Sequence, residues 1–176
     1  MSTPRAPSPR LLDRYHGDDV APLYTGRVSV KGGEARHGRA SGIARSDDGA
    51  LDVHLRLPEA LGGNGGGCNP EQLLAAAYAA CFHGAMTLLA ARAGLSLKDA
   101  QVDAAVTFSR DPVDGLFVLS ARVDVMLPGM ARDVAAELIR NTERICPYAK
   151  MFRHGIEHAV ALAPEPMPSV PPVGGD

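Results

Sequence analysis

The sequence contains no tryptophan, and its four phenylalanines and four tyrosines make up only 5% of the 176 residues. A core formed by this chain must therefore be built mainly from alanine, valine and leucine. Cysteine is also scarce, because three widely spaced residues are too few for the disulfide framework of a small secreted protein. We therefore expect a cytoplasmic protein, in which any functional disulfide is transient and linked to redox chemistry.

An excess of one charge is absent as well. The formal net charge is -2 and the isoelectric point is about 6.3, so the composition does not favour binding to nucleic acid. The N-terminal segment MSTPRAPSPR is polar and rich in proline, unlike the apolar region of a signal peptide. We predict a flexible proline-rich arm (residues 1–22), a single domain (23–162) and a disordered proline-rich tail (163–176).

One apolar stretch lies in the middle of the chain. The segment NPEQ at residues 69–72 has the features of a helix N-terminus: a capping asparagine, a proline suited to the first turn and an acidic residue after it. The run at residues 73–93 has few ionisable side chains, which predicts a helix buried on most sides. His83 and Gly84 at its centre argue against a membrane span.

Alternating polar and apolar residues predict strands on both sides of this helix. A second, amphipathic helix is predicted over residues 130–145, and Pro147 should end it. The order βββ-α-ββ-α-β lacks regular βαβ alternation, so we predict an α+β fold with antiparallel-rich sheets around a buried central helix. The predicted strands are residues 23–31, 39–46, 51–57, 102–110, 116–127 and 155–162.

Two patterns with familiar chemistry are present but incomplete. The glycine-rich segment 61–68 lacks the Gly-Lys-Ser/Thr of a phosphate-binding loop, so we expect it to let the backbone pass tightly into the helix cap. His154 and His158 have the spacing of zinc ligands, but Gly155 interrupts the segment between them. We therefore expect neither a metal nor a bound cofactor.

The segment NPEQLLAAAYAACF, followed about sixty residues later by a helix that ends in ICPYA, resembles the organic hydroperoxide resistance branch of the OsmC superfamily. SDDGALDVHL and LGGNGGG fit the same resemblance, which covers residues 23–162. The resemblance implies a thiol-dependent peroxidase that reduces organic hydroperoxides and is recycled by a dithiol, typically protein-bound lipoyl. It also implies an OsmC-like fold that forms an intertwined homodimer, with two active sites at the interface.

The same resemblance assigns roles to individual residues. Cys81 is the peroxidatic cysteine, and Cys146 is the resolving cysteine that traps its sulfenic acid as a disulfide. A peroxidatic cysteine must be a thiolate, and an always-charged guanidinium is the usual means of stabilising one in an apolar helix. The resemblance places such an arginine in the first hairpin. Counted back from the segment SDDGALDV, Arg39 needs the smallest shift to match the position of the family's arginine, and Arg36 is the alternative. Glu71 should hold this arginine by an ion pair.

Geometry adds a condition on the dimer. Glu71 and Cys81 are ten residues apart, which is about 15 Å along a straight helix. A glutamate and an arginine do not easily bridge that distance within one chain. We therefore expect Glu71 to serve the partner's Cys81, with two central helices packed antiparallel across a two-fold axis.

Other interpretations remain open at this point. Cys81 in an apolar helix is ordinarily a packing residue, and Cys146 could be a buried helix-end cysteine. Cys68 lies outside the pair and is expected to be a bystander. A cysteine hydrolase would need a histidine oriented toward Cys81 as its base. His83 points about 200° away from Cys81 around the helix. A dimeric module that binds a lipid-like ligand without catalysis is the third possibility.

Overall fold

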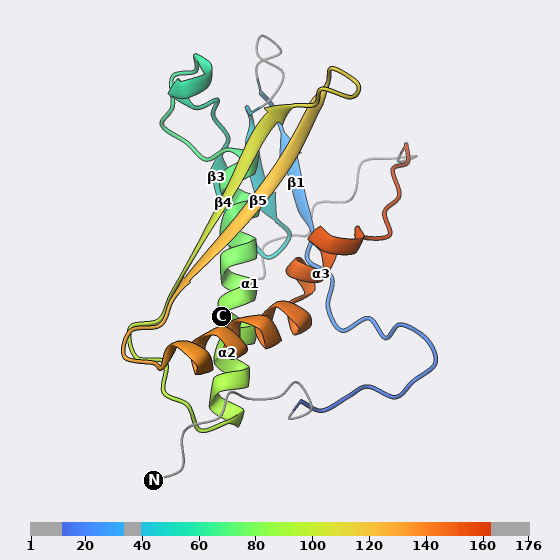
Figure 1. The fold of residues 1–176 in the computed structure, drawn as a ribbon. Coiled ribbons are helices and arrows are strands. Elements are labelled where there is room, and N and C mark those ends of the chain that lie inside the picture. The colour runs from blue at the N-terminus through green and yellow to red at the C-terminus, as the bar shows by residue number, and fades with distance from the viewer. Residues whose placement is uncertain (1–11, 34–39, 163–176) are drawn as a thin grey trace, which may run out of the picture. The chain divides into compact units, whose positions relative to one another are not determined.

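The computed structural model describes residues 12–33 and 40–162 (Figure 1). These residues form two compact units, one made of residues 12–16 and 71–156 and the other of residues 17–70 and 157–162. In chain order the elements are β1 (Val28–Lys31), β2 (Ile43–Ser46), β3 (Asp52–His54), a short 3₁₀ helix (Glu59–Leu61), α1 (Pro70–Arg92), β4 (Gln101–Arg110), β5 (Phe117–Met126), α2 (Arg132–Ile145) and α3 (Pro147–His154).

Helix α1 is the long element of the first unit. It starts at Pro70, directly after the predicted cap, and it is followed by Gly94 in the left-handed conformation with φ 65°. Its buried residues recur at helical spacing and define one face. Each large apolar side chain on that face contributes roughly 1.5–3 kcal/mol through burial. The buried residues are Tyr78, Phe82, Met86, Leu89 and Ala90.

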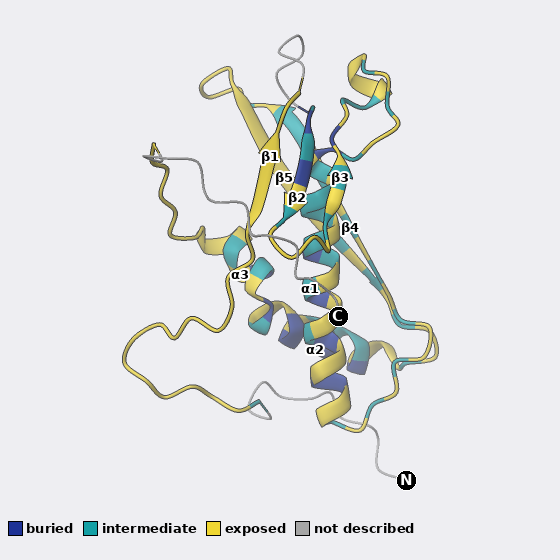
Figure 2. Ribbon diagram, turned by 180° about the vertical axis from the view of Figure 1, so that it is seen from behind, coloured by how far each residue is buried: buried dark blue, intermediate teal, exposed yellow. Residues whose placement is uncertain are grey.

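The buried face of α1 packs against the other elements of its unit. Strands β4 and β5 pair antiparallel over their full lengths, from Gln101 opposite Met126 to Arg110 opposite Phe117. Their residues Val102 and Val125 contact both core clusters, and α2 adds Leu138 to the second cluster. Figure 2 shows the buried positions on α1 and α2, whereas β5 is largely exposed. The first unit is thus a helical layer on a two-stranded ribbon.

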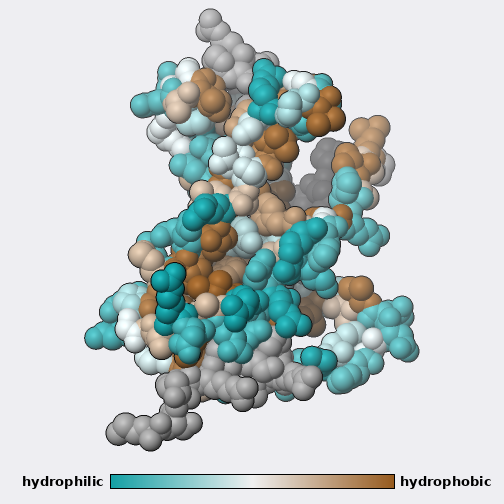
Figure 3. Space-filling view, in the orientation of Figure 1, coloured by the Kyte–Doolittle hydropathy of each residue, from teal (hydrophilic) through white to brown (hydrophobic). Residues whose placement is uncertain are grey.

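Much apolar surface in this unit is uncovered. In the most apolar part of α1, 22% of the residues are buried, although the helix is long and apolar enough to cross a membrane by length and composition alone. Strand β5 exposes Phe117, Val118 and Leu119 as well. Figure 3 shows hydrophobic side chains reaching the surface on the face drawn. The helix expected to be buried on most sides is therefore buried on one side within the single chain.

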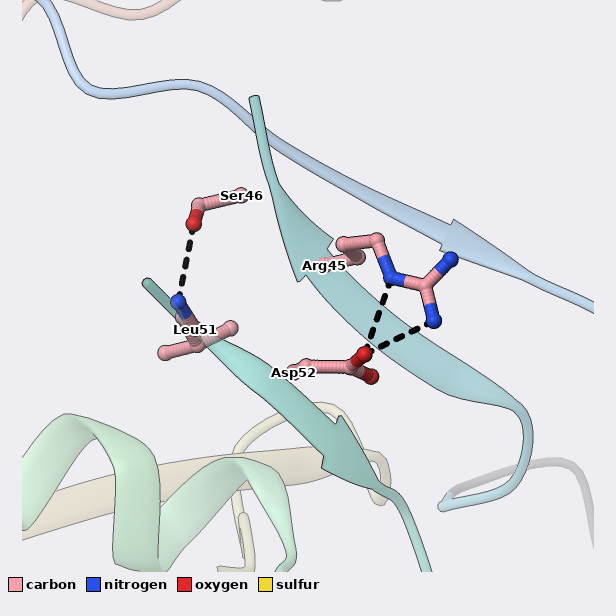
Figure 4. Close-up of polar contacts among 4 residues, drawn as sticks. All are labelled: Arg45, Ser46, Leu51 and Asp52. Atoms are coloured by element: carbon pink, nitrogen blue, oxygen red, sulfur yellow. Dashed lines mark hydrogen bonds and ion pairs between the residues drawn. The ribbon is translucent and has the colours of Figure 1, made fainter. Parts of the chain in front are cut away.

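The second unit contains the predicted three-stranded meander. Strand β2 pairs antiparallel with both β1 and β3, so the order in the sheet is β1-β2-β3. Arg45 lies opposite Asp52, and its Nε and Nη2 donate to Asp52 Oδ2 at 3.1 and 2.7 Å (Figure 4). The Leu51 N–H donates to Ser46 Oγ at 2.9 Å and tightens the turn between the strands. The prediction of this meander is confirmed, with shorter strands than expected.

The glycine-rich segment packs closely against the chain that precedes it. Cys68 exchanges backbone hydrogen bonds with this chain: its N–H donates to His54 O at 2.9 Å and its carbonyl accepts from Arg56 N at 2.8 Å. A Cβ at Gly67 would lie 2.6 Å from His54 O, and a Cβ at Gly63 would overlap the carbonyl of Leu57. The tight passage expected of this segment is therefore observed, and it depends on the missing side chains.

The C-terminal part differs from the prediction. Helix α2 ends at Ile145, before Pro147, as predicted, but Pro147 also opens α3, because a proline fits the first turn of a helix, where its missing N–H costs nothing. Helix α3 ends before Gly155, which has φ 73°. The strand expected over residues 155–162 is not formed, and these residues carry no regular secondary structure. The predicted α+β class with antiparallel sheets and a central helix is nevertheless confirmed.

The packing at Gly63 generates a test of stability. Gly63→Ala should lower the free energy of unfolding by about 3 kcal/mol, because the added methyl group meets backbone and the backbone must move. Gly66→Ala is the control, since a Cβ there meets nothing and only the positive φ of 75° is strained, at a cost of about 1 kcal/mol. Urea unfolding measures both. Equal losses would show that close approach does not matter at Gly63.

Candidate active site

Cys81 lies near the middle of α1, on the edge of its buried face. It is partly exposed, while its neighbour Phe82 is buried. The side chain contacts a core cluster that contains Tyr78, Cys146 and Ala149. Cys81 is therefore a partly exposed cysteine packed against an apolar cluster.

Cys146 lies at the corner between α2 and α3. It is fully buried, and its backbone is engaged by both helices: its N–H donates to Thr142 O at 2.9 Å and its carbonyl accepts from Lys150 N at 3.0 Å. Pro147 follows at once and forces the change of direction, because proline cannot continue the hydrogen bonding of α2. Two helix ends thus fix the position of this thiol.

The fold brings the two sulfur atoms together from positions 65 residues apart. Cys146 Sγ lies 3.5 Å from Cys81 Sγ, and both cysteines are free. A disulfide requires sulfur atoms about 2.05 Å apart, so a shift of about 1.5 Å would join them. The arrangement can therefore exchange between a dithiol and a disulfide with little movement of the chain.

Aromatic rings surround the thiol pair. Tyr78 stacks on Phe152 with ring centroids 4.8 Å apart and on Tyr148 with centroids 6.3 Å apart. Phe82 meets Tyr78 edge to face, with centroids 6.4 Å apart. These rings come from α1 and α3 and make the neighbourhood of the sulfur atoms apolar.

Electrostatic effects on the site follow from this burial. Burial raises the pKa of the Cys146 thiol, the backbone N–H of Ala149 lowers it, and the hydrogen bond to Cys81 raises it again. Burial also raises the pKa of Tyr78, and Cys146 and Glu143 act in the same direction. Cys146 is thus held as a neutral thiol that donates its hydrogen to the Cys81 sulfur.

Of the remaining expected residues, Glu71 is not brought to the thiols within the chain. Glu71 lies in the first turn of α1, ten residues or about 15 Å along the helix from Cys81. Arg36 and Arg39 lie outside the described residues. Cys68 belongs to the other unit, where its backbone bridges to Leu55.

Metal ligation and a hydrolase arrangement have no geometric support in the described part of the chain. Residues 12–33 and 40–162 contain no group of three or more His, Cys, Asp or Glu that could hold a metal ion. His83 is exposed on α1, and no histidine within those ranges hydrogen-bonds to Cys81, whose partner is Cys146. The chemistry that the described site offers is that of two thiols.

Several residues at the site were not predicted from the sequence. Tyr78 lies in an apolar helix, where nothing in the sequence set it apart from its neighbours. Phe152 and Arg153 lie on α3, a helix that was missed because Pro147 was interpreted only as a stop. The usable signal was an eight-residue segment that begins with a proline, has basic residues in its last turn and is followed by a glycine.

Comparison with known proteins agrees with this architecture. The family model described as OsmC-like protein matches residues 63–161, which is more than half of the chain. The chain therefore belongs to the OsmC-like protein family. Within that family its similarity is to the organic hydroperoxide resistance branch, which confirms the resemblance drawn from the sequence.

Three relatives illustrate the similarity. The organic hydroperoxide resistance protein of Xanthomonas axonopodis pv. citri is 40% identical over 80% of this chain and 95% of its own length. Organic hydroperoxide resistance protein OhrB of Bacillus subtilis is 35% identical over 80% of this chain and 98% of its own length. The crystal structure of OhrB matches this chain with a TM-score of 0.64, and the match covers 76% of this chain and 93% of the OhrB chain. A Legionella pneumophila organic hydroperoxide resistance protein OsmC is similar in structure, with a TM-score of 0.67, 34% identity and coverage of 77% and 93%.

The environment of Cys146 predicts its titration. Because its pKa is raised, the folded chain holds the thiol proton more tightly, and less thiolate is present at neutral pH than for an ordinary cysteine. The ultraviolet absorbance of the thiolate, titrated in the wild type and in Cys146→Ser, isolates this residue as a difference curve. Its midpoint should lie above the usual range of cysteine, and Cys68→Ser is the control. A midpoint at or below that range would contradict the assignment.

Proposed function

We propose that this protein is a thiol-dependent peroxidase that reduces organic hydroperoxides and uses Cys81 and Cys146 as its redox pair. The observation that carries the proposal is a partly exposed cysteine whose sulfur lies 3.5 Å from that of a fully buried cysteine, among aromatic side chains. The names of the similar proteins, which refer to organic hydroperoxide resistance, support the same substrate class. The aromatic surroundings favour bulky apolar hydroperoxides over hydrogen peroxide.

The first step takes place at Cys81, the thiol that is reachable from outside. Its thiolate attacks one peroxide oxygen and the O–O bond breaks. The sulfur gains this oxygen as a sulfenic acid, while the other oxygen leaves with the organic group and takes up a proton as an alcohol. The sulfur is oxidised by two electrons and the peroxide is reduced by two.

The second step protects Cys81 from further oxidation. The Cys146 sulfur attacks the Cys81 sulfur, the S–O bond breaks, and the oxygen leaves as water with the proton of Cys146. A disulfide results, and an external dithiol reduces it by exchange. We assign this role to a dithiol such as protein-bound lipoyl, in a reducing cytoplasm.

A complete site needs a positive charge near Cys81, since the attacking group must be a thiolate and a guanidinium stabilises it. We propose that Arg39, or else Arg36, supplies it and that Glu71 holds this arginine. Because Glu71 is about 15 Å from Cys81 along α1, the proposal requires Glu71 to act on the partner's Cys81. The catalytic unit is then a homodimer.

The surface of α1 supports such a dimer. Ala76, Ala80 and Gly84 recur every four residues and are all exposed, so two backbones could approach closely along this line. A Cβ at Gly84 would meet nothing within 4 Å in the chain itself. We propose that a second copy of α1, rather than a lipid surface, covers this face.

The main test of function compares substrates and thiol variants. The purified wild type should consume tert-butyl and fatty-acid hydroperoxides with dihydrolipoamide as reductant, at least tenfold faster than hydrogen peroxide. Cys81→Ser should be inactive, because it lacks the attacking sulfur. Cys146→Ser should reduce one equivalent and then over-oxidise at Cys81. Peroxide consumption and peptide mass spectrometry measure these outcomes.

Controls separate the alternatives. Cys68→Ser should keep full activity. A disulfide between Cys68 and Cys81 as the main product would show that Cys68, and not Cys146, is the resolving cysteine. Stoichiometric binding of a lipid-like molecule without peroxide consumption would indicate a binding module. A Cys81 acyl intermediate formed with esters would indicate a hydrolase.

The proposed dimer has its own test. Gly84→Leu should reduce dimer content and peroxidase activity together at least tenfold, because its side chain would occupy the space of the facing helix. Gly84→Ala should keep the dimer and favour the helix by about 1 kcal/mol. Light scattering after size exclusion gives the mass, and circular dichroism verifies folding. A monomeric wild type with full activity would refute the dimer.

A further inference from the structure

The corner that carries Cys146 has a defect in its hydrogen bonding. In a continuous helix, the N–H of residue 147 would bond to the carbonyl of Glu143, four residues earlier. Pro147 has no N–H, so the last such backbone bond in this part of α2 is the one from Cys146 to Thr142. The chemistry of proline therefore deprives the Glu143 carbonyl of its helical partner.

Arg153 supplies the missing donor. Its Nη2 donates to the Glu143 carbonyl at 3.0 Å, and its Nη1 lies 3.4 Å from Glu143 Oε1. One guanidinium thus caps the end of α2 and pairs with a side chain on the same residue. Because Arg153 lies in the last turn of α3, this contact closes the angle between the two helices.

The neighbouring residue fixes α3 from another side. Phe152 stacks on Tyr78, which lies one turn before Cys81 on α1, with ring planes 27° apart. The pKa of Tyr78 is raised by burial and by Cys146 and lowered by Arg153, so the guanidinium charge is felt at the ring beside the thiols. The far end of α3 is held to α2 by Arg153 and to α1 by Phe152, while its near end carries Cys146.

We propose that Arg153 is a positioning residue for resolution: by capping the Glu143 carbonyl that Pro147 leaves open, it holds Cys146 within reach of oxidised Cys81. This inference rests on the proposed function, because it concerns the step in which the Cys146 sulfur displaces the oxygen of the Cys81 sulfenic acid as water. Arg153 does not touch the reacting atoms. Its removal should therefore leave the first step unchanged and slow the second.

Of the two contacts between Arg153 and Glu143, the hydrogen bond to the backbone carbonyl is the more important one. The ion pair between Arg153 and Glu143 is exposed at 40% and 49% of the two side chains, so water and salt weaken it. The bond to the carbonyl replaces a main-chain hydrogen bond and survives when the carboxylate is neutralised. Glu143→Gln should consequently have a small effect, below about threefold, compared with about tenfold for removal of the guanidinium, the loss expected for a charge-assisted hydrogen bond.

The experiment measures the two steps separately in full-length protein. Single-turnover consumption of tert-butyl hydroperoxide reports the first step, and quenched samples analysed by mass spectrometry report formation of the Cys81–Cys146 disulfide. In Arg153→Ala, the first rate should stay as in the wild type, disulfide formation should slow about tenfold, and Cys81 should over-oxidise at about tenfold lower peroxide. Arg153→Lys, which keeps a cationic donor, should recover most of the rate. Arg144→Ala, which removes an exposed arginine in the last turn of α2, should behave as the wild type.

The outcomes are distinguishable from failure of the proposed function. Diamide oxidises vicinal thiols without a peroxide, so the variants can be ranked by diamide-driven disulfide formation even if the wild type consumes no hydroperoxide. The same order, with Arg153→Ala slowest and Arg153→Lys near the wild type, would support the positioning role in that case too. Disulfide formation at the wild-type rate in Arg153→Ala, equal slowing in Arg144→Ala, or equal slowing of both steps would overturn it.

Discussion

Cys146 occupies a corner of the chain that a proline creates, and the contact between the two sulfur atoms depends on that corner. Pro147 stops α2 because it has no N–H, and the same residue opens α3 because the first turn of a helix needs none. If α2 continued through residue 147, the helical turn of α2 alone would set the direction of the Cys146 side chain. The break instead places the sulfur at a junction anchored by both helices, 3.5 Å from Cys81.

The partner thiol is placed by different means. Helix α1 is continuous for 23 residues, and its position is set by one face of large side chains packed against β4, β5 and α2. Its opposite face carries the small residues Ala76, Ala80 and Gly84 and is exposed in the single chain. The same helix therefore holds Cys81 rigidly on one side and leaves a long surface for association on the other. The packing of the core and the proposed dimer therefore both depend on the two different faces of α1.

Local signals in the sequence were sufficient for most elements. The NPEQ segment located the start of α1, and alternation located β4 and β5 within one residue of their observed ends. The two thiols were paired by the family resemblance, and no spacing rule would have paired residues so far apart. Helix α3 and Arg153 were missed for a physical reason: a proline signals both an end and a beginning, and a side-chain cap is visible only once the unpaired carbonyl is known. The arginine of the first hairpin lies outside the described residues, where geometry cannot choose between Arg36 and Arg39.

The long separation between the two thiols has a consequence for folding thermodynamics. A bond between Cys81 and Cys146 would close a loop of 65 residues, which in the chain-entropy account removes enough freedom from the unfolded ensemble to stabilise the folded chain by about 4 kcal/mol. The oxidised protein would then be its more heat-resistant form, and reduction would lower its melting temperature again. Thermal stability would thereby report the oxidation state of the chain, with no substrate or reductant present.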